Sequence, residues 1–98
     1  GLFQRAAELS PYFLDAVFAL KDAPGITDIR GYGLIAGFDL EPGKTPAARG
    51  AALQKKMFAN GLHVKCTGDA AIIAPPFVAE RKHIDQIVDI VRKSMKEI

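Results

Sequence analysis

The segment 61–77 restricts the fold of this chain more than any other part of the sequence. Gly61 is typical of a helix end, and Gly68-Asp69 forms a tight turn between two short strand-like runs at 63–65 and 70–74. Pro75-Pro76 stops the second run before another helical pattern begins. The segment therefore predicts a helix, an antiparallel hairpin and a second helix in direct succession.

Apolar residues at spacings of three and four predict an amphipathic helix at the start of the chain. Its apolar face consists of Leu2, Phe3, Ala6, Leu9, Phe13, Val17 and Leu20. Pro11 interrupts the pattern, and Ser10 is a suitable N-cap for a helix whose first residue is Pro11. We therefore expect a kink or a restart at Pro11, and an end of the segment at Ala23-Pro24-Gly25.

Strand-like runs at 26–30 and 34–40 flank Gly31-Tyr32-Gly33 and predict a first antiparallel hairpin. A helix should start at Thr45-Pro46, with threonine as the N-cap, and end at Asn60-Gly61. A last helix has an apolar stripe of Ile84, Ile87, Val88, Val91 and Met95. The predicted order is αββαββα, an α+β fold in which helices pack on a small antiparallel sheet.

The length and composition indicate one small globular domain, 1–98. Of the 98 residues, 49% are hydrophobic and 24% are charged, and no apolar run approaches the roughly 20 residues that span a bilayer. The net charge of +2 is spread along the chain, without the basic face that nucleic-acid binding requires. We therefore expect neither a nucleic-acid partner nor a membrane partner.

The cysteine content and the start of the chain give two further expectations. Cys66 is the single cysteine, which excludes an internal disulfide and, with only two histidines in the chain, a metal site. This cysteine usage favours a reducing compartment, and we expect a cytoplasmic protein. The chain begins with glycine and almost at once enters a helical pattern, so we expect it to be part of a larger protein.

Few side chains are spaced for catalysis. His63 and His83 have no serine, cysteine or carboxylate at a spacing that indicates a triad. Gly31-Tyr32-Gly33 joins two strands, whereas a phosphate-binding loop runs from a strand into a helix N-terminus. Asp85 and Asp89 lie one helical turn apart among lysines and arginines, which indicates a solvated face of mixed charge.

Lys65 is the remaining candidate. It lies in a predicted strand between Val64 and Cys66, whose side chains point to the opposite face. A long cation beside an apolar hairpin is either a solvated edge residue or a group that meets an anion, and the spacing allows both. From the residues alone, the domain holds at most one binding group and no catalytic machinery.

Several segments resemble one enzyme family, over essentially the whole chain. They are Asp28-Ile29-Arg30-Gly31-Tyr32-Gly33-Leu34-Ile35-Ala36-Gly37, Gly61-Leu62, Gly68-Asp69, Ala74-Pro75-Pro76-Phe77 and the final helix from Ile84. In this order they look like the C-terminal small domain of class III aminotransferases, which are pyridoxal-phosphate enzymes of fold type I. The similarity is closest to the omega-amino-acid and amine:pyruvate branch, which includes β-alanine:pyruvate aminotransferases.

The resemblance implies a function for a longer protein. Such enzymes transfer an amino group from an omega-amino acid or amine to pyruvate or a similar oxo acid, as homodimers with the active site at the subunit interface. The lysine that forms the Schiff base with pyridoxal 5'-phosphate, the aspartate at the pyridine nitrogen and the phosphate-holding groups lie in the family's large domain. None of them falls within residues 1–98. The chain alone is therefore expected to be inactive, with no catalytic, cofactor-binding or metal-binding residue.

The family pattern does reach Lys65. Many members place an arginine four residues before the aspartate of the Gly-Asp turn, where it binds the substrate α-carboxylate, and this chain has Lys65 there. Lysine lacks the planar, bidentate recognition of a carboxylate that arginine provides. Lys65 therefore either does the same job more loosely or marks a preference for other substrates. It is the substrate-binding residue that the resemblance implies.

Two groups of alternatives stay open. Within the family, they are an ornithine, aminobutyrate or diamine aminotransferase and an aminomutase, because the substrate-facing residues lie mostly upstream of this region. Outside the family, the order αββαββα is also that of stand-alone ligand-binding or regulatory modules.

Overall fold

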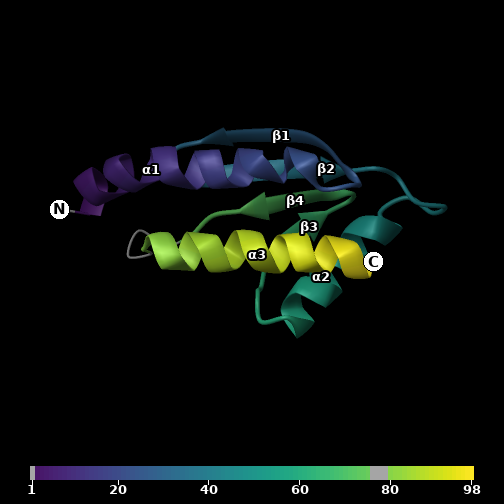
Figure 1. Ribbon diagram of the computed structural model, residues 1–98. Coiled ribbons are helices and arrows are strands. Elements are labelled where there is room, and N and C mark those ends of the chain that lie inside the picture. Colours follow the sequence, from purple (N-terminus) through teal and green to yellow (C-terminus); the bar gives the residue numbers. More distant parts are fainter. Residues whose placement is uncertain (1, 76–79) are drawn as a thin grey trace.

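The computed structural model describes residues 2–75 and 80–98, in which helices cover one face of a four-stranded sheet (Figure 1). The elements follow in the order α1 (Leu2–Phe18), the 3-10 turn η1 (Ala19–Asp22), β1 (Ile26–Tyr32), β2 (Ile35–Leu40), α2 (Ala48–Ala59), β3 (Lys65–Thr67), β4 (Ala70–Ile73) and α3 (Arg81–Glu97). This order confirms the α+β fold and the αββαββα succession. Pro76 of the predicted Pro-Pro stop and Phe77 of the family-like segment lie outside the described residues.

The first helix, α1, is continuous through Pro11, so the predicted restart at this residue is wrong. Pro11 has no N–H to donate to the carbonyl oxygen of Ala7, one turn earlier. The hydroxyl of Ser10 donates to that oxygen at 3.3 Å, so Ser10 replaces a missing donor and does not act as an N-cap. Phe13 and Val17 on the same helix are fully buried. Burial of this apolar stripe offsets the cost of an internal proline, about 3 kcal/mol.

The sheet is antiparallel throughout, in the strand order β1-β2-β4-β3. The first hairpin is confirmed, but β1 runs on to Tyr32 because this residue still pairs with Ile35. The turn is therefore the short one at Gly33 and Leu34, not the predicted Gly31-Tyr32-Gly33. Gly33 has a φ of 61°, the left-handed conformation that tight hairpin turns require.

The second hairpin is also confirmed, but β3 begins at Lys65 and not at the predicted His63. The residues before Lys65 form the C-terminal cap of α2. The N–H of Leu62 donates to the carbonyl of Met57 at 2.8 Å, and Gly61 adopts the left-handed conformation with a φ of 96°. This helix ending agrees with the predicted stop at Asn60-Gly61 and delays the start of the strand.

The second helix, α2, begins at Ala48, so its predicted start at Thr45-Pro46 is wrong. Its first turn is capped from elsewhere in the chain. The carboxylate of Asp69, in the turn between β3 and β4, accepts the N–H of Gly50 at 3.0 Å and the N–H of Ala47 at 3.3 Å. Because a distant aspartate satisfies these donors, α2 needs no local cap from Thr45.

One hydrophobic core lies between the sheet and the helices. The buried side chains of the sheet are Ala36, Phe38 and Leu40 of β2 and Ala71 and Ile73 of β4. Helix α3 contributes its predicted stripe, with Ile87 half-buried. In Figure 1, α1 and α3 lie side by side over the sheet, and α2 packs against α3 and β3. No helix within the described ranges has the length and apolar character to cross a bilayer.

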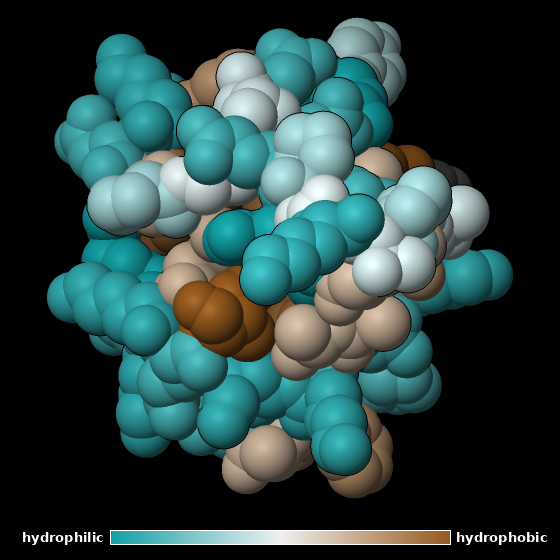
Figure 2. All heavy atoms as spheres, turned by 90° about the vertical axis from the view of Figure 1, so that its right-hand side faces the viewer, coloured by the Kyte–Doolittle hydropathy of each residue, from teal (hydrophilic) through white to brown (hydrophobic). Residues whose placement is uncertain are grey.

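Outside this core the surface is mostly hydrophilic at one end of the molecule. Figure 2 shows the end at which α3 finishes, where hydrophobic residues form only small areas among hydrophilic ones.

Candidate functional site

The face of the sheet that turns away from the helices carries a row of residues across all strands. Lys65 pairs with Ile72, Ile72 with Gly37, and Gly37 with Arg30. Residues that pair directly across antiparallel strands project from the same face. Lys65, Ile72 and Arg30 are all exposed, in contrast to the buried neighbours Ala36 and Ala71. We call this row, with Tyr32 and Ile35 beside it, the open face.

Arg30, at one end of the row, forms ion pairs with two nearby aspartates. Its guanidinium lies 3.1 Å from Asp39 and 3.4 Å from Asp28. The hydrogen bond to Asp39 is the main reason that the pKa of Arg30 is raised above its usual value. Gly37 has no side chain, and the guanidinium carbon lies 3.9 Å from where a Cβ would be. Arg30 therefore folds over Gly37 toward its two aspartates.

Lys65, at the other end of the row, has no such partner in the part of the chain that the structure describes. Arg30, Lys56 and Lys82 form ion pairs there, and none of these pairs includes Lys65. Its exposed side chain stands on the edge strand of the sheet, so its ammonium group is available to an anion. The structure thus places Lys65 on the accessible side of the hairpin, and whether it binds substrate stays a prediction.

Beside Arg30 the open face is apolar and hollowed, and the hollow extends to Ile72, the strand partner of Lys65. Tyr32, Ile35 and Ile72 are 89%, 60% and 47% exposed, and they line an open groove of about 520 Å³ whose floor includes Gly37. Three exposed apolar side chains on one face of a small domain make this groove a candidate binding surface. Lys65 does not line the groove itself but pairs with its lining residue Ile72, so an unpaired cation and an apolar surface lie close together, which suits a molecule with an anionic end and a hydrocarbon part.

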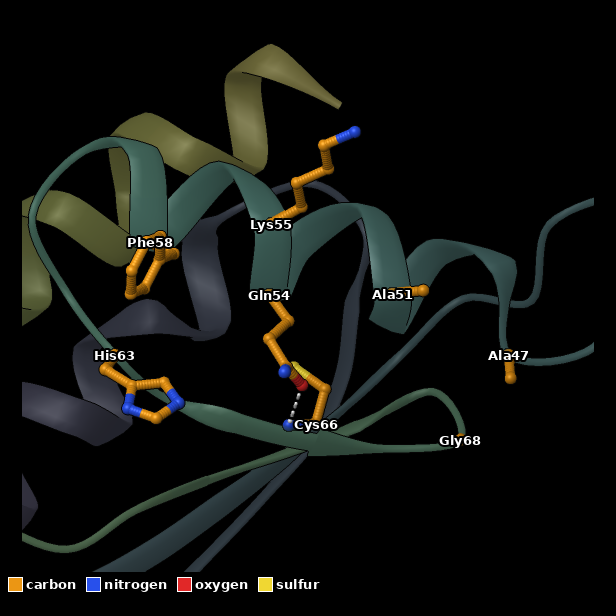
Figure 3. A pocket seen from close by; sticks show the side chains of 8 residues that line it. All are labelled: Ala47, Ala51, Gln54, Lys55, Phe58, His63, Cys66 and Gly68. Atoms are coloured by element: carbon orange, nitrogen blue, oxygen red, sulfur yellow. Dashed lines mark hydrogen bonds between the residues drawn. The ribbon is translucent and has the colours of Figure 1, made fainter.

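The strand that bears Lys65 is held against α2 by two side chains that the sequence reasoning missed. The N–H of Cys66 donates to Oε1 of Gln54 at 2.8 Å (Figure 3). Asp69 fixes the following turn through its bonds to the first turn of α2. All three bonds join segments far apart in the sequence, and no local spacing signals them.

The histidines and the aspartate pair that the sequence analysis rejected as catalytic groups make structural contacts. His63 is exposed and meets Phe58 edge to face, with ring centroids 5.9 Å apart, and His83 accepts the N–H of Glu80 at the start of α3. Asp85 accepts the hydroxyl of Tyr12, so it is not paired with Asp89. Within residues 2–75 and 80–98, no group of histidine, cysteine and carboxylate side chains could hold a metal ion.

Pyridoxal phosphate does not fit the residues that are present. Asp28 and Asp39 face Arg30, and Asp69 caps α2, so these aspartates are not free to pair with a pyridine nitrogen. The start of α2, where a phosphate would otherwise find N–H donors, is taken by the same Asp69 carboxylate. Cys66 is half-buried, and this burial raises the pKa of its thiol, which makes it a poor nucleophile.

The fold is that of solved transaminases. A structure described as "Transaminase with L-ala" superposes on 98% of this chain with a TM-score of 0.93, at 23% sequence identity. The match covers 24% of that longer chain. At this identity the likeness defines the fold, and it agrees with the α+β architecture described above.

The sequence defines the family. The family model "Aminotransferase class-III" matches residues 1–95. The omega-aminotransferase of Caulobacter vibrioides is 39% identical over 98 residues, which cover 99% of this chain and 22% of that enzyme. Gamma aminobutyrate transaminase 1, mitochondrial, of Solanum lycopersicum is 32% identical over 108 residues, 99% of this chain and 20% of that enzyme. The chain belongs to the class III aminotransferases, which confirms the predicted resemblance, and spans about a fifth of the length of these relatives.

Proposed function

We propose that the protein is an omega-type aminotransferase, of which these 98 residues are the C-terminal small domain. It transfers an amino group from an omega-amino acid or amine to pyruvate or a similar oxo acid. Membership of class III and the 39% identity to an omega-aminotransferase support this proposal. Family membership also favours this function over a stand-alone ligand-binding module.

Pyridoxal 5'-phosphate is the cofactor of the proposed reaction, and residues outside this chain hold it. When bound, it supplies the electron sink that lets an amino group pass between two carbon skeletons. We further propose that the full protein is a cytoplasmic homodimer. Ornithine, aminobutyrate and diamine donors and an aminomutase activity remain the rivals, and assays with each donor would separate them.

The role of this domain in the reaction is to bind the carboxylate of the substrate through Lys65. The observation that carries this proposal is the contrast between the two cations of the open face. Arg30 is matched by Asp28 and Asp39, whereas no described carboxylate meets Lys65. The adjoining groove of Ile35 and Ile72 would receive the hydrocarbon part of the substrate.

The test compares substrates that differ only in the carboxylate. In the full-length enzyme, we expect Lys65→Ala to lower kcat/KM for an omega-amino acid by about tenfold or more, because a charged hydrogen bond in a partly dry site is lost. The same variant should lower kcat/KM for the matching simple amine much less. Lys65→Arg should retain the preference for the carboxylate.

Lys55→Ala is the matched control for this test. It removes the same charge from an exposed lysine of α2 that points away from β3 in Figure 3, so it should leave both substrates unaffected. Equal losses of kcat/KM for the two substrates in Lys65→Ala would show that Lys65 does not bind the substrate carboxylate.

A further inference from the structure

We propose that Gln54 is a positioning residue for Lys65, and that it thereby sets the preference of the enzyme for substrates with a carboxylate. This inference rests on the proposed function of Lys65 and extends it to a second residue. Gln54 itself touches no substrate; it acts on the strand that carries the cation.

The strand in question, β3, has little support of its own. It contains only three residues, Lys65–Thr67, and lies at the edge of the sheet, so it has one strand neighbour, β4. Lys65 is its first residue, paired with Ile72, and the residue before it is outside the strand. An edge strand this short would fray at its first residue unless something held its outer side.

Gln54 holds that outer side. The N–H of Cys66 points away from β4 and donates to Oε1 of Gln54 at 2.8 Å. Figure 3 shows the Gln54 side chain reaching down from α2 to this amide, next to the half-buried Cys66 side chain. Cys66 directly follows Lys65, so the bond fixes the peptide adjacent to the cation.

The helix that carries Gln54 is itself fixed against the same hairpin. Asp69 accepts two N–H groups from the start of α2, and a Cβ on Gly50 would lie 1.9 Å from the carbonyl oxygen of Gly68. At this close approach α2 cannot slide along the hairpin. Gln54, about one turn further along α2, therefore meets Cys66 at a set position, and α2 supports β3 in place of another strand.

Loss of the Gln54 bond should thus act on Lys65 selectively. Without the Gln54 acceptor, the Cys66 N–H donates to water instead, and the start of β3 becomes more mobile. The Lys65 ammonium group then spends less time at the position where the substrate carboxylate binds. The simple amine makes no contact with Lys65, and its turnover should be unchanged. A purely structural role would instead lower both activities in parallel.

The experiment is a double-mutant cycle in the full-length enzyme. The readout is the ratio of kcat/KM for an omega-amino acid to kcat/KM for the matching simple amine, measured on the same preparation, so that the fraction of folded enzyme cancels. We expect Gln54→Leu to lower this ratio about fivefold when Lys65 is present. We expect no effect of Gln54→Leu on the ratio in the Lys65→Ala background.

Two further variants make the result specific. Gln54→Glu keeps a side-chain oxygen that can accept the Cys66 N–H, and it should retain most of the ratio. Gln86→Leu makes the same chemical change as Gln54→Leu at an exposed glutamine of α3, and it should leave the ratio unchanged.

The possible outcomes separate this inference from the proposed function. If Lys65→Ala lowers the ratio but Gln54→Leu does not, or does so equally without Lys65, Gln54 is not a positioning residue and the role of Lys65 stands. If Lys65→Ala leaves the ratio unchanged, the proposed carboxylate site fails and this inference fails with it. An effect of Gln54→Leu that disappears with Lys65 supports both.

Discussion

At Gly50 the backbone of α2 approaches the β3–β4 turn more closely than any side chain would permit. A Cβ added there would lie 1.9 Å from the carbonyl oxygen of Gly68, a backbone atom that cannot swing aside. The N–H of the same residue donates to Asp69. Glycine near the start of α2 thus permits a tertiary contact that no other residue allows. Its low helix propensity is the cost of this contact.

We expect Gly50→Ala to destabilise the protein by about 1–3 kcal/mol, because the new methyl group forces α2 away from the turn. Helix propensity alone predicts the opposite sign, a gain of about 0.5–1 kcal/mol. Urea unfolding of the variant checks the sign. Ala51→Gly, at the next and exposed position, is the control and should lose up to about 1 kcal/mol through propensity. A Gly50→Ala variant more stable than the parent would contradict the close contact.

At the residue scale, the orientation of Lys65 could be predicted from the sequence, whereas the hydrogen bonds around it could not. Alternation along the hairpin correctly predicted that Lys65 faces away from Val64 and Cys66. It could not predict the bonds that hold β3, because these join residues separated by 12, 19 and 22 positions. It also could not show that Arg30 is matched by Asp28 and Asp39, since Asp39 reaches it only through the pairing of β1 with β2.

At the scale of elements, polar contacts above the core join α1 to α3. The hydroxyl of Tyr12 on α1 donates to the carboxylate of Asp85 on α3, and the guanidinium of Arg81 lies 5.0 Å from the centre of the Tyr12 ring. The hydrogen bond to Asp85 is the main reason that the pKa of Tyr12 is raised above 10.0. This contact gives the two helices a pH-dependent connection.

The sign of that dependence follows from the raised pKa. Folding stabilises the neutral phenol, so the contribution of Tyr12 is complete below pH 10 and is lost as the pH rises through the higher pKa of the folded state. We expect the stability difference between the parent protein and Tyr12→Phe to be constant from pH 7 to about 9 and to shrink at more alkaline pH. Urea unfolding across this range measures the difference. A difference that stays constant or grows above pH 10 would contradict the assignment.

The elements themselves could be predicted because their apolar periodicities are clear, whereas their boundaries depend on tertiary contacts. The restart expected at Pro11 is absent because Ser10 supplies a donor to Ala7 and the core holds α1 on both sides. The start expected at Thr45-Pro46 shifts to Ala48 because Asp69 provides the cap. In both cases a local signal is outweighed by a contact that sequence spacing does not reveal.

For the whole molecule, the arrangement separates a packed side of the sheet from the open face. The helices and the core occupy one face of the sheet, and the open face presents Lys65, the groove and the exposed residues Tyr32, Ile35 and Ile72. In the proposed enzyme, this face closes the substrate pocket over a cofactor that other residues hold. The domain then contributes to the choice of substrate and not to the chemistry of amino transfer.

The most direct test of this division is an activity assay on the 98-residue chain alone. The chain is incubated with pyridoxal 5'-phosphate, an amine donor and pyruvate, and product formation is compared with that of the free cofactor and of the full-length enzyme. We expect the chain to give no turnover above the free-cofactor rate, while the full-length enzyme turns over both substrates. Cofactor-dependent turnover by the chain well above the free-cofactor rate would show that it carries catalytic machinery, and would contradict the account.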